Sequence, residues 1–206
     1  MSQEIYEIVK GMDLENIETQ LALQCAPLIT GLKVSNLLII SKGNEEVVKR
    51  ILNRTGISYY RLIQTRTKTT FLLFRRNELE EFLSDENVRN VLMKAGYKSL
   101  QIDKILRTFS LRYEAYIQGD KSFPHEMGLL LGYPVEDVVG FVENNGKNFL
   151  YSGYWKVYEN QKDKVKLFDN IILCFGNGGV AQLARASGSY PAGRWFESIS
   201  RYHIYA

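Results

Sequence analysis

The chain has 206 residues, of which 45% are hydrophobic and 24% charged, and its formal net charge is +3. These values are typical of one globular domain and exclude a disordered or low-complexity chain. No apolar run approaches the roughly 20 residues of a membrane span, and the first residues lack the pattern of a signal peptide. The two cysteines, Cys25 and Cys174, provide neither a disulfide framework nor a CxxC metal knuckle. We therefore expect a reduced, cytoplasmic protein with no membrane partner.

Hydrophobic periodicity in the first 75 residues predicts alternating helices and strands. Pro27 should end or kink the first helix near Cys25 or Ala26, because the residue before a proline avoids the α region. The predicted hairpin has an Arg66-Thr67-Lys68 connection without the usual glycine or asparagine. This order of elements along the chain, strand, helix, strand and strand, predicts a small mixed sheet. Its first two strands should run parallel if they are neighbours. The expected elements are a helix over 14–26, a strand over 36–40, a helix over 44–52 and strands over 57–65 and 69–75.

Helices dominate the next part of the chain, where capping residues and glycines mark their ends. A clean apolar stripe follows the cap at Ser99 and continues to Ile117. The aromatic segment 149–158 is expected to be extended. Together these patterns predict one α+β domain over residues 1–170, with about three strands covered by several helices. The remaining predicted helices span 77–83, 86–95, 124–131, 134–143 and 161–168.

Two groups of motifs resemble a known family. The first is HEMGLLLGYPVEDVVGFVENNGKN followed by GYWKVYEN, and the second is LALQCAPLITGLKVSNLLII further upstream. Both resemble the bacterial family filed as domain of unknown function 3793, over about residues 5–170. The resemblance implies no reaction, because this family has no established activity.

The stretch 123–160 is the first candidate for a functional site, because it combines a histidine, two short helices, a glycine turn and a run of aromatics. We expect a cytoplasmic module that binds a small molecule or a protein partner there, and the sequence leaves any cofactor unknown. The alternative is that these aromatic side chains form part of the core, as they usually do in an extended run. The candidate ligand-binding residues are Tyr133, Tyr154, Trp155 and Lys156.

A thiol-dependent hydrolase or transferase is the second hypothesis. Cys25 and His125 are the minimum for thiol catalysis, in which an imidazole takes the proton and the thiolate attacks. Gln24 could donate to an oxyanion, and Glu126 or Asp137 could orient the imidazole. However, Cys25 falls toward the end of its predicted helix, where the helix dipole disfavours a thiolate. The alternative is that Cys25 is a small buried hydrophobe and His125 a satisfied polar side chain.

Other chemistries have weaker support. One histidine and one cysteine from distant segments match no metal-ligand spacing, so no metal site is predicted. The turn 41–44 is placed for anion contact before a helix, but it is not a P-loop.

The predicted hairpin over 57–75 could present a nucleic-acid face, although charged strand edges that block aggregation explain the same residues. Because the net charge outside the C-terminal tail is only +1, we expect no nucleic-acid partner. The hairpin residues concerned are Arg61, Arg66, Lys68, Arg75, Arg76, Tyr59, Tyr60, Phe71 and Phe74.

The last thirty residues differ in character from the rest. Their segment GVAQLARASGSYPAGRWFES resembles the peptide obtained when a transfer-RNA gene is translated. Residues 195–198 can be encoded TGG TTC GAA TCC, which contains the pattern of a T arm. Residues 187–192 can be encoded as an anticodon arm with the anticodon CAT. We therefore expect residues 176–206 to be a non-native tail and leave them out of the functional argument; the alternative is a natural glycine-rich appendage.

Overall fold

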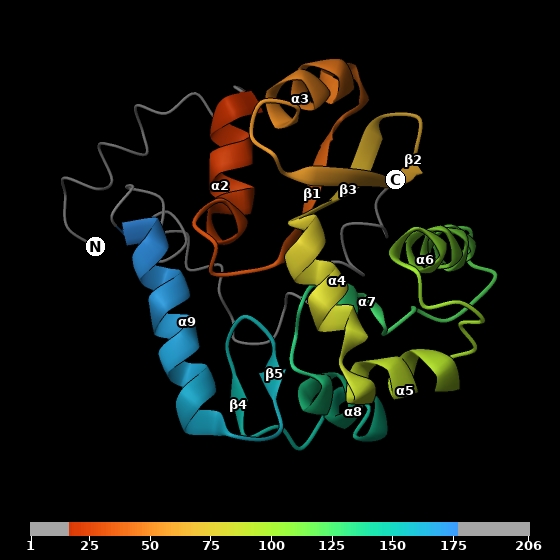
Figure 1. Ribbon diagram of the computed structural model, residues 1–206, viewed down its shortest axis with the longest axis vertical. Helices are drawn as coiled ribbons and strands as arrows, with labels where there is room; N and C mark the ends of the chain where they lie inside the picture. The colour runs from red at the N-terminus through yellow and green to blue at the C-terminus, as the bar shows by residue number, and fades with distance from the viewer. Residues whose placement is uncertain (1–16, 177–206) are drawn as a thin grey trace. The chain divides into compact units, whose positions relative to one another are not determined.

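The computed structural model describes residues 17–176 (Figure 1). These residues divide into two compact units. Residues 33–139 form one unit, called here the central unit, and residues 17–32 with 140–176 form the terminal unit. None of the described helices combines the length and apolarity needed to cross a membrane. The predicted tail lies outside the described residues, except for Gly176 at the end of the last helix.

The central unit contains a three-stranded sheet in the order β1-β3-β2. The predicted α+β class with about three strands is confirmed. The expectation of a mixed sheet was wrong, because β3 lies between the other two strands and pairs antiparallel with both. Six of the seven residues of β3 are buried, whereas β2 is mostly half-exposed, so β3 is the strand suited to the middle. The strands are β1 (Ser35–Ser41), β2 (Ser58–Gln64) and β3 (Lys68–Phe74).

Helices of the central unit begin and end close to the predicted positions. Asp85 caps α5 as expected, since its carboxylate accepts from the backbone N–H groups of Asn87 and Val88. Helix α6 packs against β2, and the Ser110 hydroxyl donates to the Leu62 carbonyl at 2.6 Å. These elements are η1 (Lys42–Asn44), α3 (Glu45–Leu52), α4 (Arg76–Ser84), α5 (Glu86–Lys94), α6 (Ile102–Ile117) and α7 (Met127–Leu130), while α8 (Val135–Glu143) begins in the central unit and ends in the terminal unit.

Helix α7 is shorter than the helix predicted over 124–131. Residues 124–126 form a turn instead, in which the Met127 N–H donates to the Pro124 carbonyl at 3.1 Å. Gly132 ends the helix with φ +69°, a conformation that residues with a side chain rarely adopt. A Cβ atom at this position would also lie 2.5 Å from Val34 Cγ2.

The terminal unit contains two helices and a small hairpin. The two helices contact each other. Pro27 was expected to end or kink the first helix, and the helix instead continues through it to Ile29. Pro27 removes one backbone hydrogen bond from the last turn. The Thr30 hydroxyl donates to the Pro27 carbonyl at 3.3 Å just after the helix ends. The aromatic segment predicted as extended forms the hairpin, and the last helix is longer than predicted. The elements are α2 (Ile17–Ile29), β4 (Tyr151–Ser152), β5 (Lys156–Val157) and α9 (Gln161–Gly176).

Candidate functional site

Cys25 lies in the second half of α2, in the terminal unit, and only 1% of it is exposed. Gln24 precedes it and is half-buried. A position one turn before the end of a helix meets the negative end of its dipole, which disfavours a thiolate. His125 belongs to the central unit, so the pairing of Cys25 with His125 stays a prediction.

We expect Cys25 to react slowly with iodoacetamide in the native protein, because the reagent needs an accessible thiolate. Its alkylation should become fast only when the chain is unfolded in urea. Peptide mapping by mass spectrometry separates the Cys25 peptide from the Cys174 peptide. Rapid alkylation of native Cys25 at neutral pH would contradict the burial of this thiol and favour the thiol-enzyme hypothesis.

His125 lies in the turn before α7 and is half-buried. Its ring meets the ring of Phe123 edge-on, with 5.5 Å between the two centroids. Burial lowers the pKa of His125, while the adjacent Glu126 carboxylate acts in the opposite direction. The imidazole is therefore held mainly in its neutral form at neutral pH.

Glu126 was predicted as a group that could orient the imidazole, and its carboxylate accepts hydrogen bonds from Arg112 and Tyr97. Its Oε1 accepts from Arg112 Nη1 at 2.7 Å and from the Tyr97 hydroxyl at 3.0 Å. Arg112 also donates through Nη2 to the Ala95 carbonyl at 2.7 Å, and its guanidinium lies 4.5 Å from the Tyr97 ring centroid. Burial, together with the Glu126 carboxylate, raises the pKa of Tyr97 and keeps its hydroxyl protonated as a donor. This cluster joins α6, the end of α5 and the start of α7.

Two of the predicted ligand-binding residues are buried. Tyr133, in the central unit, is 3% exposed, and Lys33 Nζ lies 5.1 Å from its ring centroid. Burial raises the pKa of Tyr133, so its phenol stays neutral. Trp155, in the terminal unit, is 4% exposed. Direct contact between either ring and a ligand therefore requires a local rearrangement.

The hairpin β4–β5 packs against α9 through Phe168. The ring centroid of Phe168 lies 4.6 Å from that of Trp155, 5.8 Å from that of Tyr154 and 6.1 Å from that of Tyr151. Gly153 allows this close approach, because a Cβ atom there would lie 2.3 Å from Phe168 Cδ2. The aromatic residues of the segment thus hold the hairpin on the helix.

Lys156 fixes the loop that precedes the hairpin. Its Nζ donates to the Gly146 carbonyl at 2.7 Å. The same ammonium lies 5.6 Å from the ring centroid of Phe141 and 5.0 Å from that of Phe149, within range of cation–π attraction. Lys156, predicted as a ligand-binding residue, is therefore already engaged within the terminal unit.

Four large apolar side chains next to this loop remain exposed. We call them the hairpin patch: Val142 (47% exposed), Phe149 (41%), Leu150 (56%) and Tyr151 (39%). Sequence reasoning selected other aromatics of the same stretch and missed these residues. The available signal was the consecutive run of Phe149, Leu150 and Tyr151, because an alternating strand cannot bury all three on one face.

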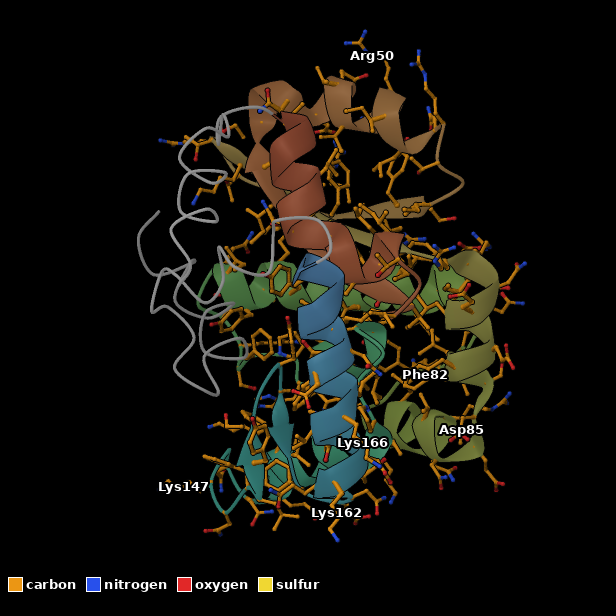
Figure 2. All side chains as sticks on the ribbon, turned by 90° about the vertical axis from the view of Figure 1, so that its left-hand side faces the viewer. Arg50, Phe82, Asp85, Lys147, Lys162 and Lys166 are labelled. Carbon is orange, nitrogen blue, oxygen red and sulfur yellow. The ribbon has the colours of Figure 1, made fainter. Side chains whose placement is uncertain are left out.

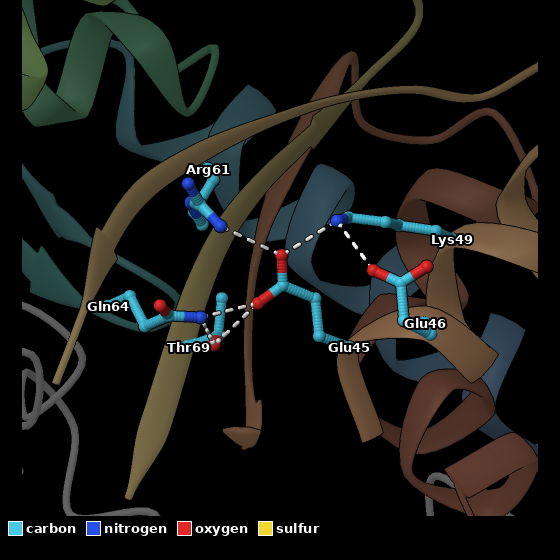
Figure 3. A network of polar contacts seen from close by, with 6 residues as sticks. All are labelled: Glu45, Glu46, Lys49, Arg61, Gln64 and Thr69. Carbon is cyan, nitrogen blue, oxygen red and sulfur yellow. Dashed lines mark hydrogen bonds and ion pairs between the residues drawn. The ribbon is translucent and has the colours of Figure 1, made fainter. Parts of the chain in front are cut away.

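A second unpredicted cluster surrounds Glu45 in the central unit (Figure 3). Oε1 of Glu45 accepts from Lys49 Nζ at 2.8 Å and from Arg61 Nη1 at 3.0 Å. Oε2 accepts from Gln64 Nε2 at 2.6 Å and from the Thr69 hydroxyl at 3.1 Å. Burial acts to raise the pKa of Glu45, but the hydrogen bonds from Lys49 and Thr69 and the charges of Lys49 and Arg61 outweigh it and hold this pKa below its usual range. Glu45 is therefore a buried, ionised carboxylate with four donors.

A β-bulge in β2 explains how this cluster forms. Arg61 pairs with Phe71 and Gln64 pairs with Thr69, so Leu62 is one extra residue in the ladder. Phe71 and Thr69 are two residues apart on β3 and share a face of the sheet. Their partners Arg61 and Gln64 consequently share that face, although they are three positions apart. A regular strand would have placed them on opposite faces.

Comparison with known proteins gives one match. The model of the family described as "Protein of unknown function (DUF3793)" matches residues 21–177. No curated protein and no solved structure matches the chain. The matched residues include the hairpin patch and the Glu45 cluster, and the match ends beside residue 176, where the tail was predicted to begin.

Proposed function

Since the chain belongs to the DUF3793 family, as its motifs predicted, and the description of that family assigns no activity, we propose a function from the site itself. The protein is a partner-binding module, and the hairpin patch is its contact surface. The observation that carries this proposal is the exposure of three consecutive apolar residues, Phe149, Leu150 and Tyr151, together with that of Val142 on α8. Large apolar side chains left exposed within one short stretch are more typical of an interaction site than of ordinary surface.

The backbone that presents the patch is preorganised. Asn145 and Asn148 take the left-handed conformation, with φ of 50° and 57°. The Leu150 N–H donates to the Val157 carbonyl at 2.8 Å, and Lys156 holds the loop at Gly146. A preformed surface loses little conformational entropy on binding, so more of the contact energy remains as affinity.

The geometry favours a protein partner over a small molecule. The patch residues are each between 39% and 56% exposed, so their side chains are open to solvent rather than enclosed. A small ligand is normally enclosed by its site, whereas aromatic and aliphatic side chains that project from a surface act as anchors in a partner's pocket. No observation in the described residues favours the thiol-enzyme alternative, since Cys25 is almost fully buried.

Site-specific photo-crosslinking tests the proposal. A benzoylphenylalanine placed at position 150, in cells that express the chain from its own gene, should give one dominant adduct with another protein. The same probe at Lys162, an exposed residue of α9 in the same unit, should not give that adduct (Figure 2). Adding Phe149→Asp to the probe at position 150 should abolish it, because a charge in the patch opposes burial. Identical adducts from positions 150 and 162, or none from position 150, would overturn the proposal.

A further inference from the structure

The basic charge of the chain is concentrated in one short segment. Residues 42–68 carry seven basic residues against two acidic ones, a net charge of +5. The whole chain has a net charge of +3, which leaves −2 for all remaining residues. The low overall charge, from which we expected no nucleic-acid partner, therefore averages over a strongly basic segment. Its charged residues are Lys42, Glu45, Glu46, Lys49, Arg50, Arg54, Arg61, Arg66 and Lys68.

The fold gathers these residues on η1, α3 and the β2–β3 hairpin of the central unit. The Lys42 N–H donates to the Thr67 carbonyl at 2.8 Å, which places Lys42 beside the hairpin turn. Lys68 directly follows this turn as the first residue of β3 and pairs across the sheet with Ser41. Arg61 lies directly before the β-bulge of β2, and its Nη1 donates to Glu45 of α3 at 3.0 Å. Arg50 projects from α3 into solvent (Figure 2). We call the seven basic residues of 42–68 the basic surface.

Both acidic residues of the segment are already neutralised. Glu45 forms ion pairs with Lys49 and Arg61, and Glu46 pairs with Lys49 at 2.9 Å. The exposed side chains of Lys42 and Arg66 form no ion pair with any residue from 17 to 176. The basic surface thus keeps an excess of exposed cations that can attract an anionic partner.

Two further basic residues near the β2–β3 hairpin do not belong to the basic surface. Arg75 and Arg76 follow the opposite end of β3, where they pair with acidic side chains. Phe71 and Phe74 are buried. Tyr59, in contrast, is partly exposed and lies two residues before Arg61, so both side chains share one face of β2.

We infer that the basic surface binds the phosphodiester backbone of single-stranded nucleic acid. Such sites combine a cationic track for phosphates with aromatic side chains for base stacking, and Tyr59 beside Arg61 supplies the aromatic component. The buried Glu45 carboxylate holds Arg61 through Nη1 alone, so the remaining N–H groups of this half-exposed guanidinium can donate to phosphate. This inference is independent of the hairpin patch, which lies on other residues.

Fluorescence anisotropy of a labelled oligothymidylate of about 20 nucleotides tests the inference on the full chain. The double variant Lys42→Gln with Arg66→Gln should weaken binding about tenfold and reduce the slope of log K against log salt by about 1.4. The matched control, Lys162→Gln with Lys166→Gln on α9, removes the same charge and should bind within about twofold of the wild type (Figure 2). The charge-retaining variant Lys42→Arg with Arg66→Lys should also bind normally, and equal melting temperatures exclude unfolding as the cause.

Three outcomes would overturn the inference. The first is no detectable binding of the oligonucleotide at about 50 mM salt, where phosphate contacts are strongest. The second is an equal loss of affinity in the double variant and in the α9 control. The third is preferential binding to vesicles that contain phosphatidylserine, lost in the same double variant, which would assign the basic surface to anionic membranes instead.

Discussion

Replacing Arg112 by methionine is expected to lower the free energy of unfolding by about 3 kcal/mol. The side chain of Glu126 is only 10% exposed, and this substitution leaves its carboxylate with Tyr97 as the one remaining donor of the cluster. A buried charge that loses its partner keeps its desolvation penalty, which is why breaking such a pair costs more than the pair contributes. The substitution also removes the hydrogen bond to the Ala95 carbonyl and the cation on the Tyr97 ring.

Urea unfolding monitored by circular dichroism measures this effect. The matched control is Arg76→Met, because Arg76 pairs with Glu80 and Asp103 where all three side chains are substantially exposed. Exposed pairs contribute less than about 1 kcal/mol, so the control should change stability little. Arg112→Lys should fall between the two, since an ammonium keeps the charge but cannot bridge Glu126 and Ala95 as a planar fork does. Equal stability of Arg112→Met and Arg76→Met would show that the Glu126 cluster does not hold the central unit together.

Replacing Gly153 by alanine is the second large effect, with an expected loss of about 2 to 3 kcal/mol. The new Cβ would lie 2.3 Å from Cδ2 and 2.4 Å from Cε2 of the Phe168 ring, distances that the native packing cannot accommodate. Phe168 is itself wedged among Tyr151, Tyr154 and Trp155, so moving its ring disturbs all three. The β4–β5 hairpin would separate from α9.

The control for this substitution is Gly43→Ala. Gly43 lies in η1, where a new methyl group would have no neighbouring atom within 4 Å, and alanine there should leave stability unchanged or slightly raised. Thermal unfolding with tryptophan fluorescence reports on Gly153→Ala once Trp195, the second tryptophan, is replaced by phenylalanine in all variants, because Trp155 contacts Phe168. A Gly153→Ala protein as stable as Gly43→Ala, with unchanged fluorescence, would contradict the packing described for the hairpin.

Local chemistry made much of the secondary structure predictable from the sequence. The cap at Asp85, the glycine at position 132 and the apolar stripe over 102–117 each act within a few residues, and the structure contains the corresponding helix boundaries. Strand order was not predictable in this way, because the central position of β3 depends on burial from both sides. The bulge at Leu62 was not predictable either, because a strand is recognised in sequence by a strict alternation of apolar and polar residues.

The candidate site shows the same limit. The sequence singles out the stretch 123–160 as a candidate site, but residue type alone does not sort its aromatic side chains into buried and exposed ones. Trp155 is buried where Phe168 of α9 packs against it, whereas Leu150 and Phe149 of the same stretch stay 56% and 41% exposed. Long-range partners likewise decide the role of Glu126, whose arginine lies fourteen residues away.

The central claim is that the hairpin patch binds a protein partner, and the affinity of two matched variants tests it most directly. Leu150→Asp and Met93→Asp each replace an exposed apolar residue, 56% and 50% exposed, but Met93 lies on α5, away from the patch residues in sequence and in the other unit. Each variant is titrated by calorimetry against the partner protein that crosslinking at position 150 identifies. Leu150→Asp should weaken the affinity for this partner about thirtyfold, equivalent to about 2 kcal/mol. Met93→Asp should bind the partner as the wild type does. An unchanged affinity of Leu150→Asp, or an equal loss in both variants, would contradict the account.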